Sequence, residues 1–407
     1  MSGTILAQII SFATFTYLIR QYYSPSDLSN FMWFFEFVSI FAAIGALRLE
    51  TAIILERDNN LAYHLIKLCI KFLFLFSLIG GVIALIGIFI NQSFKIVLDS
   101  PLLLITVPIA IFSLGMVQIF TSWFTREQKF KTIASNKIIQ NSGSALGQFT
   151  FAISKFTSAG LILGKVFGSI VAALLLFKQY YSSKPKLDKS IAVNNRSLIQ
   201  KNKDFILYST PGTLIGTFIN FLLIHLFLTY YSEDISGEIG AAKYYLGIGF
   251  SIISSAFAQV FFSNIAKIND KQQLKKYYTY WLLRLIGIAG LVLITLHLVP
   301  NSLIVAVLGS KWTNLLPTVR IMSIWMSIMF VSSSLSYIYI KVNQQRTLIF
   351  FDIIHLLFIW LSIFISYRLY ADAETSLIWF TVTQSLYYII AIVAAYYFIE
   401  RFKPAEN

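Results

Sequence analysis

Long apolar runs separated by short polar turns recur along the whole chain. Each run approaches or exceeds the roughly 20 residues that a membrane-spanning helix needs. The alternating strands of a membrane β-barrel are absent, and a backbone in hydrocarbon must satisfy its own hydrogen bonds, so helices remain. We therefore predict twelve spans, at residues 3–20, 31–55, 66–91, 101–124, 134–153, 158–178, 205–230, 239–265, 277–299, 315–340, 347–370 and 375–399. The apolar stretch 303–308 is too short to span and is expected to lie in a turn.

The first pair of spans has a counterpart half a chain later. Residues 3–55 hold two apolar runs joined by a turn with the sequence Tyr-Tyr-Ser, and the same tripeptide returns in a similar turn 208 positions later. This repeat predicts a duplicated architecture. We expect an all-α polytopic membrane protein of about 12 transmembrane helices in two pseudo-symmetric six-helix bundles. The expected divisions are an N-terminal bundle at 1–178, a basic linker at 179–204 and a C-terminal bundle at 205–407.

Composition and charge give this arrangement a direction across the membrane. Of the 407 residues 57% are hydrophobic and only 12% are charged, and mean hydropathy is +0.72, which excludes an ordinary soluble protein. With the N-terminus placed inside, 22 Lys and Arg residues fall in cytoplasmic regions against 5 on the other side. We therefore expect both termini to be cytoplasmic, and the net charge of +14 to reflect topology rather than nucleic-acid binding. The linker either lies on an anionic leaflet or is a solvated connector.

Eight charged residues fall inside predicted spans, where a charge is costly and usually faces a cavity or a partner. They are Glu36, Arg48, Glu50, Lys165, Lys243, Arg284, Arg320 and Asp352. Five are basic, so a shared interior would be net positive and would suit the anionic head group of a substrate. The alternative is structural ion pairing. Arg48 and Glu50 are two positions apart and would not share a face of a continuous helix, so they would need other partners, such as Arg284 for Glu50.

The candidate substrate-binding cations are thus Arg48, Lys165, Lys243, Arg284 and Arg320, and the candidate ion-coupling carboxylates are Glu36, Glu50 and Asp352. Asp352 and His355 share one helix face, which allows a proton relay or a hydrogen-bonded pair. His225 and His297 are expected to be satisfied by core or interface contacts. No catalytic constellation and no Cys/His cluster with metal-ligand spacing is present. We therefore expect a transporter rather than an enzyme, without a cofactor, with coupling to a proton or sodium gradient.

Several stretches resemble a known family of bacterial membrane proteins. They are Gly3-Thr4-Ile5-Leu6-Ala7-Gln8, the turn from Arg20 to Pro25, Leu47-Arg48-Leu49-Glu50-Thr51-Ala52-Ile53, Gly160-Leu161-Ile162-Leu163-Gly164, Ala258-Gln259-Val260-Phe261-Phe262-Ser263 and Leu308-Gly309-Ser310-Lys311-Trp312. In this order, and over nearly the whole chain, they resemble the polysaccharide-transport family, the O-antigen type (Wzx-like) flippases. That family lies within the multidrug/oligosaccharidyl-lipid/polysaccharide (MOP) exporter superfamily, which also contains multidrug-and-toxin (MATE) exporters and lipid II flippases.

This resemblance implies a V-shaped, MATE-like transporter whose two bundles alternate access around a central cavity. It implies an undecaprenyl-pyrophosphate-linked oligosaccharide as substrate, such as an O-antigen or capsule repeat unit, moved to the periplasmic leaflet of the bacterial inner membrane. A polysaccharide polymerase and a chain-length regulator are the implied partners. Three alternatives stay open: a multidrug or cation antiporter of the same fold, a membrane-embedded glycan polymerase or ligase, and a scaffold that does not transport.

Overall fold

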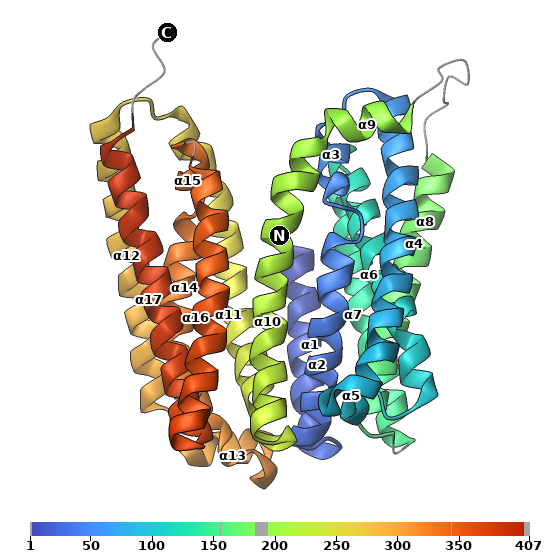
Figure 1. Cartoon of the computed structure of the whole chain (residues 1–407), viewed down its shortest axis with the longest axis vertical. Coiled ribbons are helices and arrows are strands. Elements are labelled where there is room, and N and C mark those ends of the chain that lie inside the picture. Colours follow the sequence, from blue (N-terminus) through green and yellow to red (C-terminus); the bar gives the residue numbers. More distant parts are fainter. Residues whose placement is uncertain (1, 155, 184–193, 343, 403–407) are drawn as a thin grey trace. The chain divides into compact units, whose positions relative to one another are not determined.

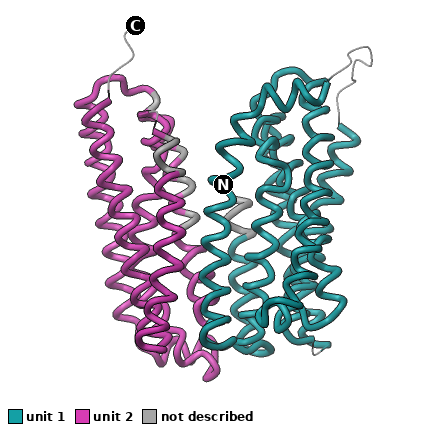
Figure 2. The backbone as a smooth tube through the Cα atoms, viewed as in Figure 1, with its two compact units in different colours: residues 1–237 teal, residues 238–407 magenta. Residues whose placement is uncertain are grey.

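The computed structural model describes residues 2–154, 156–183, 194–342 and 344–402, and the regular elements in these ranges are all helices. The chain forms two compact units, residues 1–237 and 238–407 (Figure 2). Unit 1 contains α1 (Ser2–Gln21), α2 (Pro25–Ile44), α3 (Leu49–Leu55), α4 (Asn59–Ile90), α5 (Gln92–Val97), α6 (Pro101–Arg126), α7 (Phe130–Ile153), α8 (Ser158–Ser183), α9 (Asn195–Lys201), the π-helix η1 (Phe205–Ser209) and α10 (Thr210–Tyr230). The helix α11 (Glu233–Lys267) begins in unit 1 and continues in unit 2, followed there by α12 (Lys271–Leu298), α13 (Asn301–Leu308), the 3₁₀-helix η2 (Ser310–Trp312), α14 (Leu315–Leu335), α15 (Ile338–Lys341), α16 (Gln345–Tyr370) and α17 (Ala373–Glu400) (Figure 1).

The helices confirm the polytopic all-α fold. Nine segments of the described chain are long and apolar enough to cross a membrane: α2, α4, α6, α8, η1 with α10, α12, α14 with α15, most of α16, and α17. The other three predicted spans coincide with α1, α7 and α11. The apolar stretch 303–308 lies in the short helix α13, as expected. Which side of the membrane each end faces stays a prediction.

Two sequence-based boundaries need comment. The predicted span 31–55 is wrong as one continuous helix, because α2 ends at Ile44 and α3 begins only at Leu49. The packing separates the units between Gly237 and Glu238, whereas the sequence places the junction in the linker 179–204. Residues 184–193 of that linker lie outside the described residues.

The Tyr-Tyr-Ser turn of the opening stretch is a helix N-cap. The Ser24 hydroxyl accepts a hydrogen bond from the Asp27 backbone N–H (3.2 Å), and the Asp27 carboxylate accepts one in return from the Ser24 N–H (3.0 Å). This capping box satisfies two backbone donors that would otherwise lack partners, and Pro25 fits the first helical position. The second carboxylate oxygen of Asp27 accepts from the Ser158 N–H at 2.9 Å, which fastens the start of α2 to the start of α8.

Small residues let α7 and α8 pack backbone against backbone. Gly143 and Gly147 on α7 face Gly164 and Gly168 on α8, each pair being four residues apart on its helix. A Cβ built on Gly164 would lie 2.3 Å from the Gln148 backbone nitrogen, a distance that real atoms do not tolerate. Helices in lipid associate through such close contact, since there is no hydrophobic drive between them. The small-residue segment noted in the sequence therefore has the packing role expected of it.

Aromatic and polar contacts attach α10 to the first unit. The Trp33 indole N–H on α2 donates to His225 Nδ1 on α10 at 3.0 Å, and the rings of Phe37, Phe94 and Phe221 surround this pair. His225 is thus satisfied within the core, as predicted from its sequence. These contacts explain why α10 belongs to unit 1, although the sequence repeat groups it with the helices that follow.

Replacing Gly164 with Ala should lower the thermal unfolding midpoint of the purified protein, because the new methyl group would collide with the α7 backbone. Overpacking of this kind costs about 1–3 kcal/mol. Gly290→Ala is the matched control, because a Cβ at Gly290 meets nothing within 4 Å. The control should keep the midpoint or raise it, since Ala favours a helix by about 1 kcal/mol over Gly. Equal midpoints for the two variants would contradict the close α7–α8 contact.

Candidate functional site

The backbone leaves the helical path between α2 and α3. Leu47 and Arg48 both have left-handed conformations, with φ of 53° and 58°. For residues other than glycine this conformation costs about 1–2 kcal/mol each. Such strained residues persist only where surrounding contacts hold them, and they cluster at functional sites. The break is therefore the first candidate site in unit 1.

The break brings two of the predicted charges together. Arg48 Nη1 lies 3.3 Å from Glu50 Oε1, with 33% of the Arg48 side chain exposed and 6% of the Glu50 side chain. The expectation that Arg48 and Glu50 need other partners was wrong, because it assumed a continuous helix. Arg48 is the N-cap of α3 and lies outside the helical spiral, so the two-residue spacing no longer separates the side chains.

The pair keeps unused hydrogen-bonding capacity. Within the part of the chain that the structure describes, the buried atoms Arg48 Nε and Glu50 Oε2 have no hydrogen-bond partner. A buried donor and acceptor left without partners cost free energy. An anionic group that accepts from Arg48 Nε, or a cation or proton that binds Glu50, would recover that energy.

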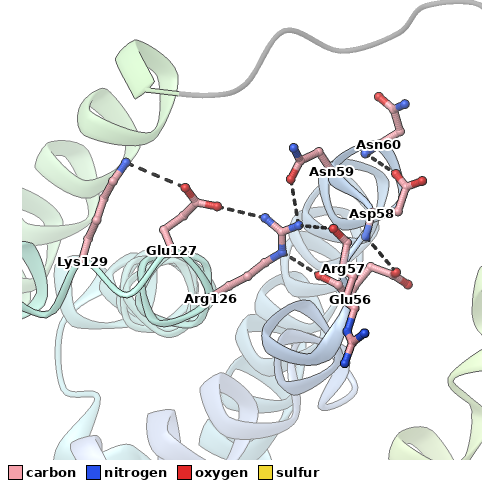
Figure 3. Close-up of polar contacts among 8 residues, drawn as sticks. All are labelled: Glu56, Arg57, Asp58, Asn59, Asn60, Arg126, Glu127 and Lys129. Carbon is pink, nitrogen blue, oxygen red and sulfur yellow. Dashed lines mark hydrogen bonds and ion pairs between the residues drawn. The ribbon is translucent and has the colours of Figure 1, made fainter.

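Arg126 at the end of α6 holds the other end of α3 (Figure 3). Its guanidinium donates to the carbonyl oxygens of Glu56 (2.7 Å) and Arg57 (3.0 Å), to Asn59 Oδ1 (2.8 Å) and to the carboxylate of Glu127 (2.9 Å). These carbonyls belong to the loop between α3 and α4. One side chain, 9% exposed, thus fixes the exit of the short helix that carries Glu50.

The segment that follows the linker reaches the same loop. Lys201 at the end of α9 forms an ion pair with Glu56 (Nζ to Oε2, 2.6 Å), and α9 packs on α4 beside this loop (Figure 1). The Lys201 side chain is 56% exposed, so this pair contributes little stability. It nevertheless links the start of the second half of the chain to the α3–α4 loop.

Two more predicted residues lie elsewhere in unit 1. Glu36 is half-buried on α2, and its side chain is engaged by other groups. Lys165 is half-buried on α8 between Gly164 and Gly168, and across the described ranges its ammonium has no hydrogen-bond or ion-pair partner. Lys165 therefore keeps its charge available, as a substrate-binding cation requires.

The three predicted cations of unit 2 have different surroundings. Lys243 is half-buried on α11 and is engaged by other groups. Arg284 is exposed on α12, with its guanidinium 4.0 Å from the Tyr280 ring centroid. Arg320 on α14 donates to the carbonyls of His297 (3.1 Å) and Val299 (2.8 Å) and so caps the end of α12. The structure does not bring these three side chains into one cluster through any contact of the described residues.

A polar cluster forms around Asp352 between α16 and α17. Asp352 Oδ1 accepts a 2.6 Å hydrogen bond from the Tyr387 hydroxyl, and His355 Nε2 lies 3.0 Å from Gln384 Oε1. The His355 and Tyr387 rings are stacked, with centroids 3.6 Å apart. Asp352 and His355 therefore each bind α17 instead of pairing with each other. An apolar cavity of about 360 Å³ opens beside His355 and Tyr387.

Sequence reasoning missed Tyr387 and Gln384, although their three-residue spacing matches that of Asp352 and His355. In the described ranges, no group of three or more His, Cys, Asp or Glu side chains lies close enough to hold a metal ion. The arrangement provides two carboxylates, Glu50 and Asp352, each buried beside a polar partner. Either could bind a proton or a monovalent cation.

Comparison with solved structures places this fold. An inward-facing multidrug resistance transporter of the MATE family, in the MOP superfamily, aligns with a TM-score of 0.72 at 13% identity, over 98% of this chain and 96% of that chain. The lipid II flippase MurJ in an inward closed conformation aligns at 0.66 and 14% identity, over 98% and 89%. A MOP transporter from Pyrococcus furiosus, described as having a binding pocket of reverse polarity, aligns at 0.62 and 12%, over 99% and 96%. The protein is a multi-pass membrane protein with the MATE fold.

The sequence identifies the family more closely than the fold does. Residues 27–317 match the model of the polysaccharide biosynthesis protein family, and the chain belongs to that family. This confirms the resemblance drawn from the short motifs. No curated protein matches the chain significantly.

Arg126→Lys should loosen α3 while keeping the charge, because a lysine ammonium cannot donate to Glu56, Arg57 and Asn59 in the fork geometry of arginine. We expect a loss of about 1–3 kcal/mol in stability and faster amide hydrogen exchange in residues 49–59. Arg196→Lys, an exposed arginine on α9, is the control and should change neither measurement. Unchanged exchange in the Arg126 variant would show that other contacts hold the loop.

Proposed function

We propose that this protein is a flippase that moves undecaprenyl-pyrophosphate-linked oligosaccharide, an O-antigen or capsule repeat unit, from the cytoplasmic to the periplasmic leaflet of the bacterial inner membrane. The observation that carries the proposal is membership of the polysaccharide biosynthesis family over residues 27–317. The fold shared with the lipid II flippase MurJ supports it, because lipid II is itself named as the cargo of that protein. Movement would proceed by alternating access of the two bundles.

Arg48 is the cation best suited to the pyrophosphate. Its Nε is buried without a partner among the described residues, while Nη1 already contacts Glu50. A guanidinium has five donors in a planar fork that matches phosphate oxygens. The pyrophosphate would take Nε and compete with Glu50 for the remaining donors. Protonation or cation binding at Glu50 would then favour the substrate-bound arrangement and connect transport to an ion gradient.

Lys165 is the second candidate contact, since its ammonium has no partner in the described chain. Arg320 is less suited, because its guanidinium already donates to the carbonyls that end α12. Removing it would expose those carbonyls, so a loss of function there would follow from instability. Lys243 and Arg284 remain candidates on grounds of charge alone.

The multidrug or cation antiporter of the same fold is the strongest alternative. A pocket for cations should carry carboxylates in excess, whereas the charges within the predicted spans here are five basic and three acidic. The transporter from Pyrococcus furiosus, with its reversed pocket polarity, indicates that proteins of this fold differ in this property. A glycan polymerase or ligase is the other alternative, and a polysaccharide polymerase and a chain-length regulator are the partners we propose for a flippase.

Arg48→Ala should reduce surface polysaccharide about tenfold or more in a strain that lacks the native gene, with the protein still present in the membrane. The loss follows from removing a charged hydrogen bond to the pyrophosphate, worth about 1.5–3 kcal/mol. Polysaccharide is measured on the cell surface, and protein amount by immunoblot of membranes. Lys95→Ala, a cation outside the predicted spans, is the control and should retain full activity. Full activity in single Ala variants of Arg48, Lys165, Lys243, Arg284 and Arg320 would contradict the assignment of these cations.

Asp352→Asn should abolish the response of transport to an imposed ion gradient in proteoliposomes, because an amide takes up no proton and binds cations weakly. The assay measures the oligosaccharide that becomes accessible on the far leaflet, with proton and sodium gradients imposed separately. Glu374→Gln removes an exposed carboxylate near the start of α17 and should respond like the unmodified protein. Transport that ignores both gradients in the unmodified protein would remove ion coupling from the proposal.

A further inference from the structure

A groove that the proposed function does not use lies on unit 2, where α12 begins and α17 ends. Its volume is about 700 Å³. Three lysines at the start of α12, two tyrosines and one leucine account for most of its wall, which contains Lys271, Lys275, Lys276, Tyr280, Leu283 and Tyr396. The groove therefore combines cations, aromatic rings and an apolar floor along one helix pair.

The positive charge of the groove is only partly neutralised. Lys271 and Lys275 share a single carboxylate, that of Glu400 at the end of α17. The Lys275 ammonium also lies 4.9 Å from the Tyr396 ring centroid, which holds it against the α17 wall. Lys276 is exposed and has no ion-pair or hydrogen-bond partner in the described ranges. Three ammonium groups thus face one carboxylate, and an anion beside Lys276 would restore the balance.

A fourth cation follows the groove deeper along α12. Lys276, Tyr280 and Arg284 are spaced by four residues and so lie on one face of the helix. The Arg284 guanidinium is 4.0 Å from the Tyr280 ring centroid, so this side chain turns back towards the start of α12. Arg284 begins about 12 Å further along the helix axis than Lys276. The cationic face therefore starts at the polar end of the helix and continues over its apolar part.

We propose that this groove binds the head group of an anionic phospholipid of the surrounding leaflet. A soluble anion would need only the lysines, whereas the floor at Leu283 and the cation at Arg284 match a ligand that has both a phosphate and a hydrocarbon chain. The apolar stretch of α12 has a mean hydropathy of 2.0, so the groove opens where a membrane helix meets the head-group layer. Lys276 would contact the phosphate, and Arg284 would lie beside the glycerol esters. This site is independent of the flippase proposal.

Native mass spectrometry of the purified full-length protein should detect phosphatidylglycerol bound more tightly than phosphatidylcholine. Lys276→Gln should weaken the phosphatidylglycerol complex about fivefold, the effect of one lysine at an anionic surface. Lys276→Arg should retain binding, and Lys311→Gln, which removes an exposed cation elsewhere in unit 2, should leave it unchanged. Lys276 has no partner to lose, so its variants should keep the unfolding midpoint, which is measured in parallel.

Equal binding of the two phospholipids, or equal affinity of Lys276→Gln and the unmodified protein, would overturn the proposal. Displacement of phosphatidylglycerol by millimolar inorganic phosphate would indicate a site for free anions and would also overturn it. Displacement by undecaprenyl phosphate at lower concentration than by phosphatidylglycerol itself would assign the groove to a substrate lipid instead. None of these outcomes depends on transport activity, so failure here leaves the flippase proposal to its own tests.

Discussion

A backbone surrounded by hydrocarbon can leave the α-helix only where other groups satisfy its hydrogen bonds. The interruption between α2 and α3 meets this condition locally. The Leu47 N–H donates to the Ile44 carbonyl (2.7 Å), the Leu49 N–H to that of Ala46 (3.0 Å), and the Thr51 N–H to that of Arg48 (3.1 Å). At the other end of α3, Arg126 takes up the carbonyls of Glu56 and Arg57. The short helix is thus held at both ends, and its position decides where Arg48 and Glu50 lie.

Holding α3 in this way keeps two charges close together in a poorly solvated place. A buried ion pair repays the cost of removing its charges from water only when its remaining donors and acceptors are also satisfied. Arg48 Nε and Glu50 Oε2 are not satisfied by any described residue. The pair is therefore poised to exchange one partner for another. A transporter site needs this property, because a fully satisfied network would have no reason to admit a substrate.

The sequence predicted the helices well and their interruptions poorly. Apolar length marks a span directly, so all twelve predicted spans fall on helices. The break after Ile44 has no such mark: Gly45 is common in membrane helices, and neither Leu47 nor Arg48 is a residue that favours a left-handed backbone. The Arg48–Glu50 pair was missed as a consequence. The place of α10 in unit 1 depends on Trp33 and His225, which are 192 positions apart, and one sequence gives no signal for such a contact.

The same limit affects the reading of charge. Five basic residues within predicted spans looked equivalent in the sequence, yet the backbone consumes one of them. Arg320 donates to the end of α12, as Arg126 does to the end of the α3 segment, and a guanidinium used in this way has fewer donors for a ligand. Arg284 rests on an aromatic ring on an exposed helix face. The positive charge available to a pyrophosphate is therefore smaller than the sequence count suggests, and Arg48 and Lys165, both in unit 1, are the cations whose donors remain uncommitted in the described chain. Specificity for an anionic substrate in this protein then depends on which helix ends need an arginine, as well as on how many arginines the spans contain.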